Sequence, residues 1–403
     1  MKRTNTAPYL LVICLLLAAC GGRTYWPDGG RDAGPDAPDS KPPDRGPDAP
    51  DSKAPDALDS KVPDAADAKV TDAGDAKVPD AADAKVTDLP GPDLLPGTWV
   101  TVKAGAFDMG SPKMEKCRAA GPGFLETLHR VTLTNKFMIM NTEVTQKEFK
   151  QIMLYDNSDV IVGDAYPAHR VTWHQAAAYC DGLTKRINDV RGKKGLKLLT
   201  RCYTDKVKGS TSCNTSPECT KPYGKVATCV SRGKLGKVCM DLLSNAPGAG
   251  IYACDGFRLP TEAEWEYAYR AGSQTPLYES KSSNGVIKEC NLTDNNAGHI
   301  GWYSKNSVQL SKVKQKEPNL WKLYDMAGNA AEWSHDGYTD DLGAAAITDP
   351  VTPVNFTKTL FQLVVRGGSY KGTPANLRGA ARALYNHTAK VENVGFRCVR
   401  TMK

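Results

Sequence analysis

A long stretch without aromatic residues limits where this chain can fold. Residues 21–96 hold thirteen of the 26 prolines, with seventeen aspartates against nine lysines or arginines, and no aromatic residue lies between Trp26 and Trp99. Such a segment cannot bury enough apolar surface to offset its ordering entropy. We therefore expect a disordered, extended linker over residues 20–96 and a folded region over residues 97–403. A wall-binding role for the linker would need the same sequence and stays open.

The charge distribution excludes two classes of protein. The chain carries a net charge of +7, and because the linker is acidic, the folded region is basic. No run of Lys and Arg is dense enough to indicate nucleic-acid binding. No run of about 18 apolar residues follows the N-terminus, so the sequence does not predict a multi-span membrane protein.

The N-terminus is typical of an exported bacterial lipoprotein. A charged start (Lys2 and Arg3) precedes a short apolar run over residues 8–19, which predicts a signal peptide over residues 1–19. The run ends in Leu-Ala-Ala-Cys, which resembles a lipobox, so we expect Cys20 to be acylated. Because Gly, not Asp, follows the cysteine, we expect an outer-membrane lipoprotein of the bacterial cell envelope, held to the membrane by its lipid anchor. An ordinary secretory signal is the alternative.

The folded region mixes short strands with a few helices. Alternation predicts a strand over residues 99–102, a turn-rich continuation over 105–111, and a strand pair formed by 131–133 and 137–140. Three helices are predicted to begin after capping threonines, at Thr145, Thr172 and Thr261. Together these elements predict an α+β domain.

Several long motifs lie in this region. They include NTEVTQKEF (141–149), PAHRVTWHQAAAYC (167–180), FRLPTEAEWEYAYRAG (257–272), PNLWKLYDMAGNAAEW (318–333), RGGSY (366–370) and NVGFRCVR (393–400). In this order they resemble the formylglycine-generating enzyme (sulfatase-modifying factor) family. The resemblance implies a modified C-type-lectin-like fold with little regular secondary structure, stabilised by calcium and disulfides. It spans nearly all of 97–402, with a Cys-rich insert at about 196–255.

The resemblance also implies calcium, which prefers six to eight oxygen ligands from irregular loops. At the main site it implies the carboxylates of Asp325 and Glu332 and the carbonyls of Gly328 and Ala330. A second calcium site of the family begins at a position that resembles Asn291-Leu292, but the loop that follows differs here.

Ten cysteines follow Cys20, an even number that favours disulfides in an exported chain. The resemblance implies a bridge between Cys180 and Cys398. Cys117 and Cys290 are left over and can pair. Six more suggest a locally stapled insert with fifteen possible connectivities: Cys202, Cys213, Cys219, Cys229, Cys239 and Cys254.

The oxidases of this family use two cysteines shortly after RGGSY, which bind Cu(I) as a thiolate pair. Here no cysteine occurs between Cys290 and Cys398, although Ser369 and Asn393 stand at matching positions. Ala331 occupies the place of an aromatic residue beside the family's substrate groove. We therefore expect no copper.

Two classes of function remain. We favour a non-catalytic module whose groove holds a peptide, glycan or protein ligand. The expected groove residues are Ser369, Tyr370, Arg378, Arg382 and Asn393. The alternative is a divergent protein-modifying oxidase of the formylglycine-generating type, with displaced copper ligands.

Overall fold

The computed structural model describes residues 95–119, 125–159, 161–203, 228–231, 237–240, 249–354 and 361–403. All of them belong to one compact unit. The expected signal peptide, Cys20 and the linker lie outside the described residues. Among those described, no helix combines the length and apolar character that a bilayer crossing requires.

Three small sheets carry most of the strands. The first has the order β1-β4-β15-β7 and the second the order β13-β12-β10-β14; the third has the order β11-β3-β2. The bounds in the first are β1 Trp99–Val102, β4 Phe137–Met140, β15 Val399–Thr401 and β7 Phe257–Arg258. In the second they are β13 Arg382–Asn386, β12 Gln362–Arg366, β10 Ala331–Gly337 and β14 Val394–Gly395. In the third they are β11 Ile347–Thr348, β3 His129–Leu133 and β2 Gly105–Met109.

Two strand pairs complete the described β-structure. They are β5 Thr228–Ser231 with β6 Lys237–Met240, and β8 Gly301–Trp302 with β9 Ala327–Gly328. The short strands and long connections match the expected α+β fold with little regular structure.

The predicted strand pair of residues 131–133 and 137–140 is wrong. Instead β3 pairs with β2, and β4 pairs with β1 and β15. The turn-rich reading of residues 105–111 is also wrong, because 105–109 form strand β2. Each segment finds its partner outside the pair, and in that pairing Val131 and Ile139 are both fully buried.

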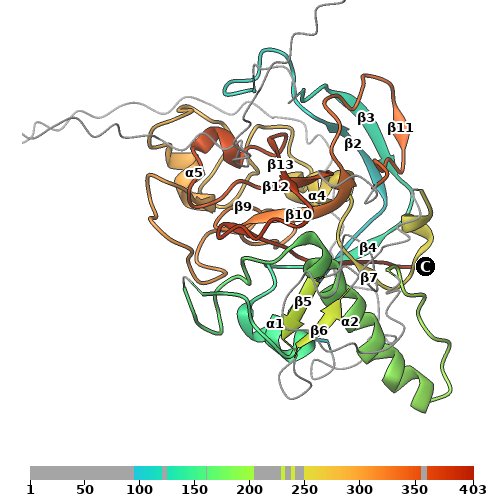
Figure 1. Cartoon of the computed structure of the whole chain (residues 1–403). Coiled ribbons are helices and arrows are strands. Elements are labelled where there is room, and N and C mark those ends of the chain that lie inside the picture. Colours follow the sequence, from blue (N-terminus) through green and yellow to red (C-terminus); the bar gives the residue numbers. More distant parts are fainter. Residues whose placement is uncertain are drawn as a thin grey trace, which may run out of the picture. The chain divides into compact units, whose positions relative to one another are not determined.

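The helices are α1 Gln146–Met153, α2 Trp173–Lys193, α4 Glu262–Arg270 and α5 Asn295–Ile300, with 3₁₀ turns η2 Ala249–Ala253 and η3 Pro374–Leu377. The three predicted capping threonines all form capping boxes, with Glu148, Gln175 and Glu264 as the reciprocal partners. Helices α1 and α2 pack side by side, whereas α4 packs against β2, β10 and β12 (Figure 1).

Three disulfides tie the described residues together. Cys180 is bonded to Cys398, in agreement with the pairing that the family motifs implied. Cys117 is bonded to Cys290. A third bridge, Cys202–Cys254, closes the base of the insert. The backbones of Cys229 and Cys239 face each other in the β5–β6 register, whereas Cys213 and Cys219 lie outside the described residues.

Candidate functional site

The RGGSY segment and the end of the chain meet at one place. Gly367 and Gly368 have φ values of +90° and +69°, which L side chains rarely adopt. A Cβ on Gly368 would lie 2.7 Å from the carbonyl oxygen of Asn376, so only glycine allows this approach. The turn presents Ser369, whose hydroxyl accepts a 2.7 Å hydrogen bond from the Asn393 amide. Two of the expected groove residues are therefore in contact.

Tyr370 lies beside this pair and forms an apolar patch. Its ring packs with Leu310 and Ala330, and the half-buried Ile161 covers the same cluster. The backbone N–H of Tyr370 donates to the carbonyl of Asn329 at 2.9 Å. The site thus combines a buried, hydrogen-bonded polar pair with a small buried cluster of aromatic and aliphatic side chains.

Charged side chains surround the patch. Lys371 forms an ion pair with Glu392, and Arg170 forms one with Asp159 at 2.8 Å. The hydrogen bond from Lys371 lowers the pKa of Glu392 below its usual value. These ion pairs are partly exposed, so they contribute little stability and remain open to exchange for a charged ligand.

Arg378 and Arg382 do not belong to this groove, so this part of the prediction is wrong. Arg378 is buried and binds Glu126 and Glu115 at 2.6 and 2.7 Å. Arg382 is also buried, and its guanidinium forms two hydrogen bonds with Glu262, at 2.6 and 3.0 Å. Both guanidinium groups neutralise buried carboxylates, because a buried charge is costly without a partner.

The segment after RGGSY offers no soft donor for copper. Gly372 follows Lys371, and Leu377 at the end of η3 is fully buried. The Leu377 carbonyl accepts a hydrogen bond from the Tyr269 hydroxyl, which locks the turn. Across the described residues, no group of three His, Cys, Asp or Glu side chains is placed to hold a metal ion.

Glu332, an expected calcium ligand, has a different partner. Arg397 donates to both of its carboxylate oxygens, at 2.7 and 2.6 Å, and the indole N–H of Trp265 donates at 2.9 Å. All three side chains are buried. The carboxylate is therefore already neutralised and hydrogen-bonded by protein groups, and its role as a calcium ligand stays a prediction.

The loop at residues 325–330 nevertheless fits a hard cation. Three buried oxygens there have no hydrogen-bond partner among the described residues: Asp325 Oδ1, Glu143 Oε2 and Asn141 Oδ1. Glu143 Oε1 accepts a 3.0 Å hydrogen bond from Asn329 in the same loop, and the carbonyl of Asn141 accepts one from Tyr324. Carboxylate and amide oxygens are the ligands that Ca²⁺ prefers.

The two carboxyl groups of this cluster are harder to ionise than exposed ones. Burial, followed by the charge of Asp325, raises the pKa of Glu143 well above its usual value. Burial raises the pKa of Asp325 to about 6. Sequence reasoning missed Glu143, although it lies inside the quoted NTEVTQKEF motif. Only the fold shows that this motif packs against the 325–330 loop.

The second expected calcium site has no comparable oxygen cluster. Asn291 and Leu292 are both exposed. The neighbouring Asp294 carboxylate accepts the backbone N–H groups of Lys288, Glu289 and Ala297, so its oxygens cap the chain.

Comparisons with known proteins agree with this fold. Residues 90–402 match the family described as the sulfatase-modifying factor enzyme 1-like domain, and the chain belongs to that family. It is 34% identical over 149 residues to a formylglycine-generating enzyme of Streptomyces coelicolor, a stretch that covers 36% of this chain and 46% of the relative. It is 32% identical over 157 residues to the serine/threonine-protein kinase Pkn1 of Chlamydia trachomatis, covering 39% of this chain and 23% of the kinase.

A solved structure shows the same fold. Treponema denticola variable protein 1 superposes with a TM-score of 0.52 and 25% identity, covering 76% of this chain and 95% of that protein. The two relatives named above are matched over less than half of their own lengths. The family and the fold are therefore shown, whereas the activity of each relative is a property of that relative.

Proposed function

We propose that this protein is a non-catalytic binding module that uses the sulfatase-modifying factor fold to hold a ligand at the groove beside Ser369 and Asn393. One observation carries the proposal. The chain keeps the hydrogen-bonded Ser369–Asn393 pair, but the segment in which the family's oxidases carry their copper thiolates holds Gly372 and the buried Leu377.

The chemistry of the groove favours recognition by hydrogen bonds and charge. Ser369 and Asn393 form a buried polar pair at the base, Tyr370 is a buried aromatic ring that is 7% exposed, and the partly exposed Lys371–Glu392 pair offers both signs of charge at the rim. A peptide, a glycan or a partner protein presents matching groups. Aromatic surfaces with nearby polar groups recur at sites of this kind.

The proposal places the module at the bacterial cell envelope. Lipidation of Cys20 would anchor it to the outer membrane, and the Pro- and Asp-rich linker would hold the folded unit away from the lipid surface. Partitioning into a detergent phase tests the anchor. Loss of partitioning in Cys20→Ala is expected, and partitioning that survives the substitution would refute it.

Binding to a peptide array and a glycan array tests the groove. The full mature chain is compared with Asn393→Ala, which breaks the hydrogen bond to Ser369, and with Ser307→Ala as an exposed control whose hydroxyl bonds only its own turn. We expect bound signals that fall at least about tenfold in Asn393→Ala, because a hydrogen bond to a bound ligand contributes on this scale. Signals that stay equal in the two variants would exclude the groove.

One observation supports a second candidate, a divergent oxidase. The carbonyl of Cys290 accepts a 3.1 Å hydrogen bond from Ala375 N–H in η3, so the Cys117–Cys290 pair lies against the segment that follows RGGSY. Reduced, these two thiols would supply a displaced soft-ligand pair. In the structure they form a disulfide, which leaves no thiolate for copper.

A further inference from the structure

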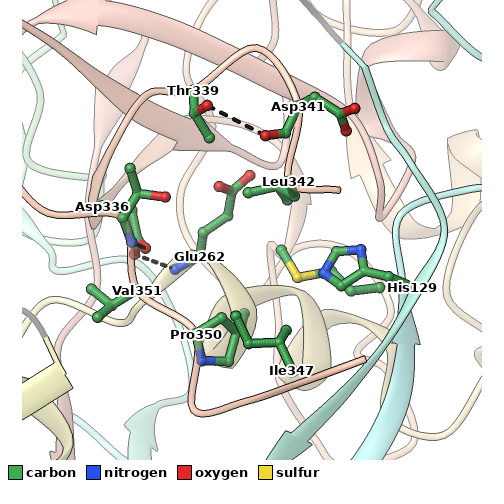
Figure 2. Close-up of a pocket in the computed structure, with 12 residues that line it drawn as sticks. His129, Glu262, Asp336, Thr339, Asp341, Leu342, Ile347, Pro350 and Val351 are labelled. Carbon is green, nitrogen blue, oxygen red and sulfur yellow. Dashed lines mark hydrogen bonds between the residues drawn. The ribbon is translucent and has the colours of Figure 1, made fainter. Parts of the chain in front are cut away.

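A cavity that shares no lining residue with the groove lies elsewhere in the folded unit. It has a volume of about 140 Å³ and lies between the start of α4, the end of β10 and the loop that contains β11. Figure 2 shows His129 and Asp336 on opposite sides of the space, with Glu262 between them. Apolar side chains form much of the remaining wall: Met109, Ala263, Leu342, Ile347, Pro350 and Val351.

His129 presents a hydrogen-bond acceptor to this cavity. The side chain is only 5% exposed, and its Nδ1 lies 2.8 Å from the carbonyl oxygen of Thr127. Because a carbonyl can only accept, Nδ1 carries the hydrogen, and Nε2 of the neutral ring is left with a lone pair. Among the described residues Nε2 has no hydrogen-bond partner, and Figure 2 shows the ring pointing into the cavity.

The opposite wall adds acceptors. The buried Asp336 carboxylate accepts the backbone N–H groups of Glu262 and Thr352 at 2.7 and 2.8 Å, and each oxygen keeps a second lone pair. Asp341 adds another carboxylate at the rim.

The donors near this wall are already used. Arg382 donates to Glu262, and the Thr339 hydroxyl donates to the Asp341 carbonyl at 3.3 Å. The remaining polar side chain of the lining, Thr352, has a hydroxyl that can donate or accept, so most of the polar side chains that line the described cavity offer acceptors.

A pocket rich in acceptors, with apolar walls, favours a specific ligand chemistry. A primary ammonium carries three donors and no acceptor, and a short alkyl chain behind it would lie along the apolar wall. A cavity of about 150 Å³ in another protein binds benzene, so this one has room for a single side chain and not for a larger cofactor. We propose that the pocket binds a primary ammonium group on a short aliphatic chain, from the lysine side chain of a partner protein or from a free alkylamine.

The charge state of Asp336 depends on pH near neutrality. Burial, and then the charge of Glu262, raises the pKa of Asp336 to about 7. Glu264 raises it further. The other charged and titratable groups around the pocket are Arg382, Arg366, His129, Asp341, Tyr203 and Tyr252. At pH 8 the carboxylate is largely ionised. None of the pocket residues belongs to the Ser369 groove, so this inference stands independently of the proposed function.

Titration of the full mature chain at pH 8 tests the proposal, with ligand-observed NMR as the readout. The probes are n-butylammonium, an internal-lysine peptide, and n-butanol as a neutral match in size. We expect saturable binding of the ammonium probes at least about tenfold tighter than n-butanol, the scale of a charge-assisted hydrogen bond. Tighter binding of the peptide than of n-butylammonium assigns the site to a partner's lysine, and the reverse order assigns it to a free amine.

Two variants locate the binding. Asp336→Asn removes the charge at nearly constant volume and should weaken binding of both ammonium probes about tenfold or more. Since this buried change can impair folding, Ile347→Trp is the second variant: Ile347 is 44% exposed at the pocket wall, and an indole there should block entry. Val308→Trp, at a 91% exposed position outside the pocket, is the control. Equal affinity for n-butanol and n-butylammonium, or full binding by Ile347→Trp, would overturn the proposal.

Discussion

The buried pair of Arg397 and Glu332 should hold together three distant parts of the chain. Arg397 donates two hydrogen bonds to Glu332, and further ones to the carbonyls of Met140 and Tyr324 at 3.1 and 3.0 Å. Neither side chain of the pair is more than 1% exposed. The substitution Arg397→Met keeps the apolar stem and removes every one of these donors.

The expected cost follows from what is left behind. After Arg397→Met the Glu332 carboxylate stays buried, with the Trp265 indole as its one remaining side-chain donor among the described residues. Breaking a buried ion pair in this way costs about 3–5 kcal/mol of unfolding free energy. In the double variant with Glu332→Gln the charge is gone. The two substitutions should therefore couple by about 2 kcal/mol or more, within the range for residues in contact.

The coupling free energy is measured in a double-mutant cycle, by urea unfolding of the wild type, the two single variants and the double variant. Unchanged m-values check that unfolding remains two-state. Lys147→Met is the matched control, because its 3.9 Å pair with Asp164 is exposed, and it should change stability by less than about 0.5 kcal/mol. The cycle is repeated with a calcium chelator. A coupling near zero, or one that appears only after chelation, would mean that calcium and not Arg397 neutralises Glu332.

Three more predictions follow from the described residues. Replacing Cys180 and Cys398 together with alanine opens a 218-residue loop and should cost about 5 kcal/mol in the chain-entropy account, and an unchanged unfolding midpoint would contradict the bridge's role. If the 325–330 loop holds calcium, a free calcium concentration of a hundred times Kd adds about 2.7 kcal/mol to the free energy of unfolding. A chelator should then lower the Tm of the wild-type protein but not that of Glu143→Gln. Equal Tm shifts in the two proteins would show that Glu143 is not a calcium ligand. Burial lowers the pKa of His335 to about 3, so below about pH 6.5 the unfolded chain binds a proton that the folded chain does not. The free energy of unfolding should therefore decrease as the pH is lowered, by about 2 kcal/mol at pH 5. His335→Gln should lose about 2 kcal/mol less between neutral pH and pH 5, and an identical pH dependence in the two proteins would refute this.

Local signals in the sequence were enough for much of the fold. A capping threonine and its partner three residues later lie within one turn, so Thr145, Thr172 and Thr261 could be identified without tertiary information. The Cys180–Cys398 bridge was accessible only through the resemblance, because 218 residues separate the two cysteines. Spacing alone fixes no connectivity.

The groove arginines show where local reading fails. Arg378 and Arg382 follow RGGSY closely in the sequence and were expected among the groove residues. Their partners are Glu126 and Glu262, more than a hundred residues earlier in the chain. Whether an arginine is a ligand contact or a buried counter-ion depends on such distant carboxylates, which a single sequence does not connect.

The calcium loop shows the same limit. Asp325 could be expected to face a cation from its own loop, but Glu143 reaches that loop from the segment after β4. The strand partners of β3 and β4 were missed for a related reason. Apolar alternation indicates that a segment is a strand, and the choice of partner depends on which faces bury together.

Cu(I) binding and product formation test the central claim most directly. The mature chain is titrated with Cu(I) against a competing chelator under reducing conditions, and then incubated in air with a cysteine-containing peptide whose mass is followed. The binding-module account predicts no tight Cu(I) site and no aldehyde on the peptide. Tight Cu(I) binding together with aldehyde formation, both lost in Cys117→Ser/Cys290→Ser, would contradict it and identify the displaced cysteine pair as the copper site of an oxidase.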